Sequence, residues 1–135
     1  MSIERERLLQ LLHRPRFHQF LGLQLEEAKE GYVKLRLPYR DDFLGDEGGT
    51  YIHGGVIASL IDVAGDFALI TVYGRGLPTV DLRIDYLRPA QKGDLFAEAA
   101  VVKGGRTLGV ADITVTNGAG KKIAVGRGLY STAGT

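Results

Sequence analysis

The chain has 135 residues, of which 44% are hydrophobic and 24% are charged, values typical of a globular protein with a buried core. Its seventeen basic and sixteen acidic residues leave a net charge of +1, which argues against nucleic acid or a membrane surface as a partner. The sequence contains no cysteine, which excludes disulfides, thiol nucleophiles and cysteine metal sites.

The N-terminal segment is predicted to be helical. Apolar residues follow a helical spacing over residues 3–13, Pro15 ends the pattern, and residues 17–22 are compatible with a second short turn of helix. Residues 4–7 are all charged, so they do not resemble a secretory signal and a cytoplasmic location is expected. We interpret residues 1–20 as an N-terminal helical segment of a single domain that spans residues 1–135.

Strands are expected on both sides of a long central helix. Apolar residues alternate over 21–25 and 33–37, and Gly31 between them predicts a hairpin, followed by a polar, glycine-rich loop over 38–52. After the helix, residues 79–86 alternate as a half-buried strand that ends before Pro89. Further strands are expected over 94–103, 107–117 and 121–131. This order predicts an antiparallel sheet with helices on one face, an α+β fold.

The central helix has an acidic residue, Asp62, in the middle of an otherwise apolar run over residues 51–70. A buried carboxylate is costly unless it is paired or used chemically. On a helix, Gly55, Ser59, Asp62 and Asp66 fall within an arc of roughly 60°. The helix is therefore expected to be buried on most sides, with one stripe of small or polar residues. Asp66 is expected at the end of this stripe or at an interface rather than in the chemistry.

The start of this helix offers a site that could polarise a carbonyl group. The amides of Gly54 and Gly55 after His53 lack intrahelical partners, and the absence of side chains lets a ligand oxygen approach them. Asp62 could act on the same ligand as general base or nucleophile. Gly54 and Asp62 are about 12 Å apart along one helix, so one carbonyl cannot reach both. Two antiparallel copies in a homodimer would bring them together in two shared sites.

The sequence resembles a known family at this point. The stretch from His53 to Asp62, followed by that from Thr79 to Pro89, resembles the hotdog-fold acyl-CoA thioesterases of the phenylacetate-degradation (PaaI-like) type. Residues 103–107 and 117–126 fit the strand-turn-strand end of that family, and the similarity covers roughly residues 20–132. The resemblance implies an antiparallel β-sheet wrapped around a long α-helix. It also implies homodimers often paired into homotetramers, and hydrolysis of acyl-CoA without metal or cofactor, since CoA is part of the substrate.

The same resemblance implies roles for individual residues. Asp62 takes the place of the catalytic carboxylate, and Gly54 that of the backbone donor to the thioester carbonyl. His53 would orient this loop, and Thr79 lies near a hydroxyl that helps to position water in relatives. Many relatives have an asparagine where this chain has Glu47, a second carboxylate that could assist Asp62 or could be displaced from the site.

Contacts to the substrate are expected elsewhere as well. Gly55 would line the carbonyl site, and Arg88, Lys103 and Arg106 are predicted near turns where CoA phosphates could bind, with Lys92 beside them. The glycines at 104–105 are interpreted as a β-turn, because the phosphate-loop pattern is missing.

Other chemistries have less support. Ser59 lacks the strand-elbow-helix setting of a nucleophile, and His13, His18 and His53 are too scattered to predict a metal site. Two alternatives stay open: a hotdog acyl-thioester hydratase or dehydratase, and a non-catalytic acyl-CoA-binding module. The acyl group could be aromatic, short or medium in length. Its pocket is expected to involve apolar and aromatic side chains, namely Phe43, Leu44, Phe67 and Tyr86.

Overall fold

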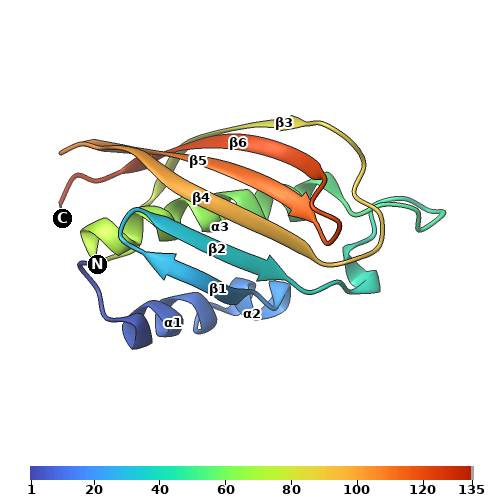
Figure 1. Ribbon diagram of the computed structural model, residues 1–135, viewed down its shortest axis with the longest axis horizontal. Coiled ribbons are helices and arrows are strands. Elements are labelled where there is room, and N and C mark those ends of the chain that lie inside the picture. Colours follow the sequence, from blue (N-terminus) through green and yellow to red (C-terminus); the bar gives the residue numbers. More distant parts are fainter. Residues whose placement is uncertain (135) are drawn as a thin grey trace.

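A computed structural model describes residues 1–134 (Figure 1). The N-terminal segment forms two short helices, and the rest contains one long helix and six strands. Most boundaries are close to those expected from the sequence, but the first strand covers Gln24–Lys29 rather than 21–25, because Leu21 still belongs to the second helix and Gly22 ends that helix in a left-handed conformation. In chain order the elements are α1 (Arg5–His13), α2 (Arg16–Leu21), β1 (Gln24–Lys29), β2 (Tyr32–Leu37), the short 3-10 turn η1 (Asp41–Phe43), α3 (Gly54–Tyr73), β3 (Thr79–Tyr86), β4 (Leu95–Gly104), β5 (Leu108–Asn117) and β6 (Lys122–Ser131).

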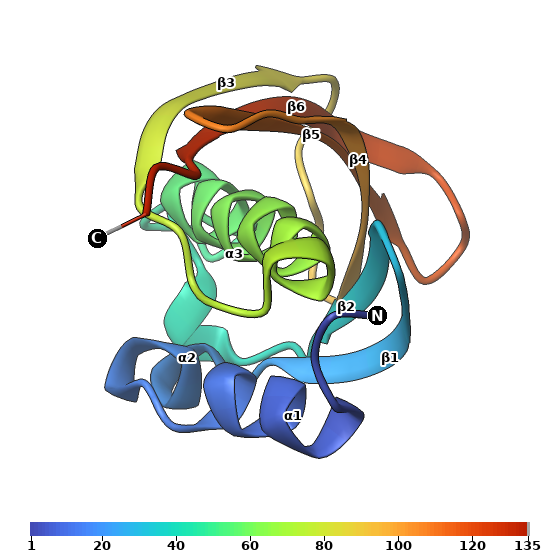
Figure 2. The same ribbon diagram turned by 90° about the vertical axis from the view of Figure 1, so that its left-hand side faces the viewer.

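The strands form a single antiparallel sheet in the order β1-β2-β4-β5-β6-β3. The sheet curves around α3, while α1 and α2 pack beneath that helix on the side away from the arch of the sheet (Figure 2). This arrangement is the hotdog fold, an α+β architecture in which a sheet encloses one long helix. The predicted fold class is therefore confirmed.

Close packing between α3 and the sheet depends on a missing side chain. A Cβ atom on Gly65 would lie 2.4 Å from the hydroxyl oxygen of Tyr130, which is fully buried on β6. The glycine allows that hydroxyl to reach α3 and donate to the main-chain oxygen of Asp62 over 2.8 Å.

The helix α3 is by length and composition apolar enough to cross a membrane. Most of it is buried inside the domain, however, as is common for the core helix of a globular protein.

The strand β3 differs from its sequence pattern. The expected alternation holds in the middle, where Leu82 and Ile84 are half-buried, but Val80 is 57% and Tyr86 50% exposed. The pairing with β6 shifts register between Thr79 and Asp81, which breaks the period-two pattern at the start of the strand. Within residues 1–134, β3 pairs with β6 alone, so it forms one edge of the sheet.

Candidate active site

The carboxylate of Asp62 lies in the middle of α3, on the flank that faces the start of β3. The hydroxyl of Thr79 donates a hydrogen bond to Asp62 Oδ1 over 2.7 Å. Tyr130 holds the main chain of the same residue from the sheet side. The carboxylate is thus positioned from two directions, and its Oδ2 accepts no hydrogen bond from any residue between 1 and 134.

A small hollow of about 180 Å³ opens beside this carboxylate. The polar stripe predicted for α3 faces it, because Ser59, Asp62 and Asp66 all line the hollow. The opposite wall comes from Phe17 and His18 of α2, which the sequence did not indicate as site residues. Their sequence neighbourhood has only an amphipathic pattern, which gives no sign of proximity to a residue more than forty positions away.

Asp66 forms part of the hollow beside Asp62. Its side chain lines the hollow one helical turn after Asp62, and its Oδ1 accepts a hydrogen bond from the Leu77 amide over 3.0 Å. Burial raises the pKa of Asp66 to about 7, and the charge of Asp62 adds to this, while the Leu77 amide opposes it. Asp66 therefore keeps its proton into the neutral range. Asp66 is a partly buried wall of the hollow, and its expected place at the end of the stripe or at an interface stays a prediction.

The start of α3 presents one free amide rather than two. His53 caps the helix, and its Nδ1 accepts a hydrogen bond from the Gly55 amide over 2.8 Å. The Gly55 amide is therefore already occupied, and the imidazole of His53 carries its proton on Nε2. The Gly54 amide has no hydrogen-bond partner among residues 1–134, while its carbonyl accepts from the Tyr86 hydroxyl over 2.6 Å. Only the Gly54 amide is free to meet a ligand oxygen.

A single chain does not bring Gly54 and Asp62 into one cavity. Gly54 lines a different hollow of about 350 Å³, together with apolar residues that include Tyr51, Ile57 and Leu87. The two residues belong to one continuous helix, which keeps them about 12 Å apart. A carbonyl group bound to the Gly54 amide is therefore out of reach of Asp62 in the same chain, and would have to react with another carboxylate.

The remaining predicted contacts lie in three different places. Glu47 is exposed at the tip of the loop before α3, which is shaped by hydrogen bonds from Thr50 and Tyr51 to the carboxylate of Asp46. Lys103 and Arg106 are exposed at the β4–β5 turn. That turn lies at the C-terminal end of α3, where the Tyr73 hydroxyl donates to the Gly105 carbonyl, and away from the start of the helix (Figure 1). Arg88 lines the hollow that contains Gly54. The structure does not bring Lys103 or Arg106 near Arg88.

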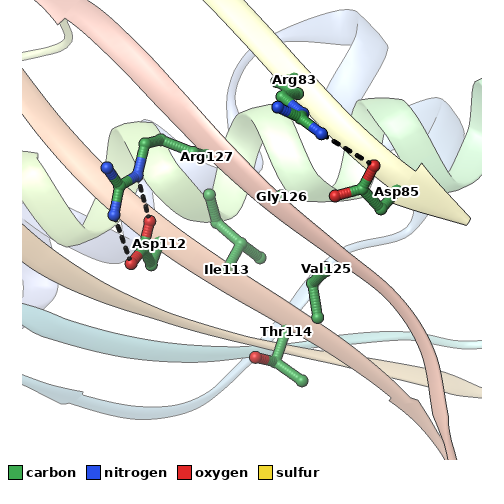
Figure 3. Close-up of a pocket in the computed structure, with 8 residues that line it drawn as sticks. All are labelled: Arg83, Asp85, Asp112, Ile113, Thr114, Val125, Gly126 and Arg127. Atoms are coloured by element: carbon green, nitrogen blue, oxygen red, sulfur yellow. Dashed lines mark hydrogen bonds and ion pairs between the residues drawn. The ribbon is translucent and has the colours of Figure 1, made fainter. Parts of the chain in front are cut away.

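The outer face of the sheet has a larger hollow, of about 440 Å³, over β3, β5 and β6 (Figure 3). Its charges are matched within the chain: Arg127 contacts Asp112 over 2.7 and 3.0 Å, and Arg83 contacts Asp85 over 3.4 Å. None of the residues predicted for the site lines it. Size alone therefore does not identify the active site, since a hollow whose charges are already paired offers a substrate little new interaction.

A hotdog fold with a carboxylate held in the middle of its helix and a free amide at the helix start matches the arrangement implied by the sequence resemblance. The family model of the Thioesterase superfamily matches residues 49–124, and the chain belongs to this superfamily. The sequence predicts a thioester hydrolase. Membership of the Thioesterase superfamily confirms this enzyme class.

Individual proteins show the same relationship. A protein of Halobacterium salinarum is 40% identical over 122 residues, an alignment that covers 82% of this chain and 80% of the relative. The medium/long-chain acyl-CoA thioesterase YigI of Salmonella typhimurium is 30% identical over 120 residues, covering 78% and 77% of the two chains. The structure of the E. coli PaaI protein, from the phenylacetic acid degradation operon, superposes with a TM-score of 0.83 at 28% identity, covering 96% and 92%. The predicted PaaI-like relationship is thus confirmed.

Proposed function

We propose that this protein is an acyl-CoA thioesterase that hydrolyses an acyl-CoA thioester to a free carboxylic acid and CoA. The observation that carries the proposal is the Asp62 carboxylate, held by Thr79 beside a hollow on the flank of α3. Membership of the superfamily supports the same reaction. The proposal includes the cytoplasmic location inferred from the sequence.

In the proposed mechanism, Asp62 acts as general base on water or as nucleophile at the thioester carbonyl. Thr79 fixes one carboxylate oxygen and leaves the other for this step. Negative charge develops on the carbonyl oxygen, where the Gly54 amide and the positive end of the helix dipole stabilise it. The carbon–sulfur bond then breaks, and CoA leaves as the thiolate. On the base route, the proton that Asp62 took from water passes to this thiolate; on the nucleophile route, water hydrolyses the mixed anhydride between the acyl group and Asp62, which releases the acid and restores the carboxylate. His53 supports the geometry by holding the adjacent Gly55 amide.

A homodimer, alone or paired into a homotetramer, is part of the proposal. Two α3 helices packed antiparallel around a two-fold axis would bring Gly54 of one subunit near Asp62 of the other. The unpaired edge of β3 and its exposed Val80 and Tyr86 support an interface on this side of the molecule. In such a dimer Glu47, at the tip of its loop, would be a candidate to reach the site of the other subunit.

The acyl group is proposed to enter a hollow of about 370 Å³ between the N-terminal helices and α3. It shares His18 and Asp66 with the hollow beside Asp62, so the two are adjacent. Its other walls are mainly apolar, and they comprise Leu11, Pro15, Phe67, Ile70, Gly76, Leu77 and Pro78. This lining favours an aliphatic chain of medium length, and a relative is named for medium and long chains. Of the four wall residues predicted from the sequence, only Phe67 lines this hollow.

The test is hydrolysis of a panel of acyl-CoA thioesters, with release of free CoA as the readout. Replacing Asp62 by asparagine (Asp62→Asn) should lower kcat by about 10²–10⁴-fold, because the uncharged amide can neither accept the proton nor attack. Asp42→Asn, at an exposed carboxylate on η1, is the matched control and should leave kcat unchanged. Equal hydrolysis rates for the parent and Asp62→Asn would refute the mechanism. A parent that releases no CoA from any thioester of the panel would instead favour a non-catalytic module or a different reaction.

A further inference from the structure

The helix α2 lies beneath α3 (Figure 2), and residues of both helices line two adjoining hollows. One is the hollow beside Asp62, and the other, the acyl hollow, is the space of about 370 Å³ proposed above for the acyl group. Two polar side chains, His18 of α2 and Asp66 of α3, line both hollows. An acyl chain that runs from Asp62 into the acyl hollow therefore passes these two polar groups at the junction.

The carboxyl group of Asp66 has one oxygen engaged and one free. Its Oδ1 accepts a hydrogen bond from the Leu77 amide over 3.0 Å, while its Oδ2 has no hydrogen-bond partner within residues 1–134. Burial, together with the charge of Asp62, raises the pKa of Asp66 to about 7, so the group carries a proton up to the neutral range. Because Oδ1 accepts, the proton belongs on Oδ2, which makes this oxygen a hydrogen-bond donor.

The imidazole of His18 is held in place and has one free nitrogen. Its Nδ1 lies 3.0 Å from the Leu12 carbonyl oxygen, and a carbonyl oxygen only accepts, so Nδ1 carries a proton. The ring also packs edge-on against Phe67, with the ring centroids 5.9 Å apart. In the neutral imidazole, Nε2 is therefore an acceptor, and it has no hydrogen-bond partner among the described residues. Asp66 and His18 thus offer one donor and one acceptor at the junction of the two hollows.

The spacing of Asp62 and Asp66 indicates which atom of an acyl chain would meet these groups. Asp66 follows Asp62 by one helical turn, about 5.4 Å. A thioester carbon under attack at Asp62 comes within about 3–3.5 Å of the attacking atom. An oxygen on carbon 3 of the acyl chain lies three covalent bonds from that carbon, about 3–4 Å away. This reach bridges the turn and brings such an oxygen to Asp66, whereas the walls beyond are mainly apolar.

We propose that Asp66 and His18 bind a hydroxyl group on carbon 3 of the acyl chain, so that the protein prefers 3-hydroxyacyl thioesters to unsubstituted ones. The inference rests on the proposed thioesterase function and names its substrate class. The hydroxyl accepts a hydrogen bond from the Asp66 carboxyl group and donates one to His18 Nε2. A keto group only accepts, so it leaves Nε2 unpaired. An unsubstituted chain covers both polar groups and pairs neither, which weakens its binding.

The experiment compares three acyl-CoA thioesters of equal chain length that carry a hydroxyl group, a keto group or only hydrogen on carbon 3. Both enantiomers of the hydroxy compound are measured separately, with release of free CoA as the readout. For the preferred enantiomer, kcat/KM should exceed that of the unsubstituted thioester by about 10–100-fold. The keto compound should lie between the two, since it pairs with Asp66 alone.

Substitutions at His18 test the acceptor. His18→Asn keeps a donor near the Leu12 carbonyl but has no atom at the place of Nε2, and the ratio of kcat/KM for the hydroxy and unsubstituted thioesters should fall about tenfold. His18→Gln places a polar atom near Nε2 and should restore part of the ratio. His13→Asn, at the exposed end of α1, is the matched control and should keep the parent ratio. The ratio compares two substrates on one preparation, so a partial loss of folded protein does not alter it.

Substitutions at Asp66 test the donor. Asp66→Ala should also lower the ratio about tenfold, because it removes the group that donates to the hydroxyl. Asp66→Asn should keep most of the preference, since the amide oxygen can accept from Leu77 while the amide nitrogen donates into the junction.

The outcomes separate this inference from the function on which it rests. A parent that hydrolyses all three thioesters with equal kcat/KM overturns the hydroxyl site and leaves the thioesterase intact. A hydroxyl preference that survives both His18→Asn and Asp66→Ala overturns the assignment to these residues. Isothermal titration calorimetry with the hydroxy and unsubstituted thioesters gives a readout without catalysis. A parent that releases no CoA, yet binds the hydroxy compound more tightly than His18→Asn does, supports the site and refutes the thioesterase.

Discussion

At the residue scale, the protonation of Asp66 links the candidate site to stability. The carboxyl is buried one turn from Asp62, and its pKa is raised from 3.8 to about 7. Between these two values the folded protein binds a proton that the unfolded chain has lost. Asp66 therefore stabilises the fold fully below about pH 4, and this contribution is lost as pH rises to about 7. A shift of this size corresponds to about 4 kcal/mol at most.

Asp66→Asn should remove this pH dependence. The amide oxygen can still accept the hydrogen bond from Leu77, but the side chain carries no charge at any pH. We expect the variant to be more stable than the parent above about pH 7 and no more stable near pH 4. Urea unfolding at several pH values and a fixed protein concentration would measure the difference. Parallel stability curves for the two proteins would contradict the assignment.

The Gly54 amide permits a second test at this scale, because proline is well tolerated at the first position of a helix. His53 has φ −58° and ψ 133°, which is compatible with a following proline. Gly54→Pro deletes the proposed donor while the helix stays intact, and kcat should fall by about 10²–10³-fold.

Gly54→Ala is the matched control, since it keeps the amide and places its Cβ 3.4 Å from the Tyr86 ring, an ordinary contact. Its kcat should stay near that of the parent. Circular dichroism would verify that both variants keep the helix. If proline and alanine lower kcat equally, the amide is not the donor.

At the scale of elements, the contact between α3 and β6 determines how firmly Asp62 is placed. Tyr130 reaches across this contact to the main chain of Asp62, and Gly65 makes room for it. The contact is dense, since Tyr130 is fully buried and burial raises the pKa of its hydroxyl above the usual range. A change in this layer should therefore affect both stability and the site.

Gly65→Ala should destabilise the protein by about 1–3 kcal/mol, because its Cβ would overlap the Tyr130 hydroxyl and force α3 away from the sheet. Gly118→Ala is the control at a turn with nothing within 4 Å of the added Cβ, and its effect should stay within about 0.5 kcal/mol. Thermal unfolding of the three proteins tests the difference. Equal stability of the parent and Gly65→Ala would contradict the prediction, because it would show that the packing between α3 and β6 adjusts to the added methyl group without loss.

At the scale of the whole molecule, the proposed active site needs two chains. Gly54 and Asp62 line separate hollows in one chain, and each subunit of a dimer would give one group to each shared site. Substitutions on different subunits should therefore complement one another.

Co-expression of Asp62→Asn and Gly54→Pro subunits tests this directly. Each variant alone lacks one group in every site, whereas a mixed dimer has one site with both groups intact. Random pairing should restore about a quarter of the parent kcat per subunit, since half of the dimers are mixed. Sizing by light scattering would verify assembly. A mixture as inactive as the single variants would exclude shared sites.

Local patterns in the sequence were sufficient to predict the helices, most of the strands and the α+β fold. Periodicity, glycine turns and capping depend on neighbours within a few positions, so they can be read along the chain. Residues that meet through distant contacts could not be found in this way. Phe17 and His18 reach the hollow beside Asp62 because α2 packs next to α3.

The sequence by itself determined the order and type of the elements and the motif that relates this chain to the thioesterase superfamily. Only the tertiary structure decided which amide at the start of α3 is free, how deeply Asp66 is buried, and which residues of α2 line the hollow beside Asp62. The physical reason is that hydrogen-bond occupancy, desolvation and electrostatic field depend on all neighbours in space. Those neighbours are brought together by the packing of the sheet and helices around α3.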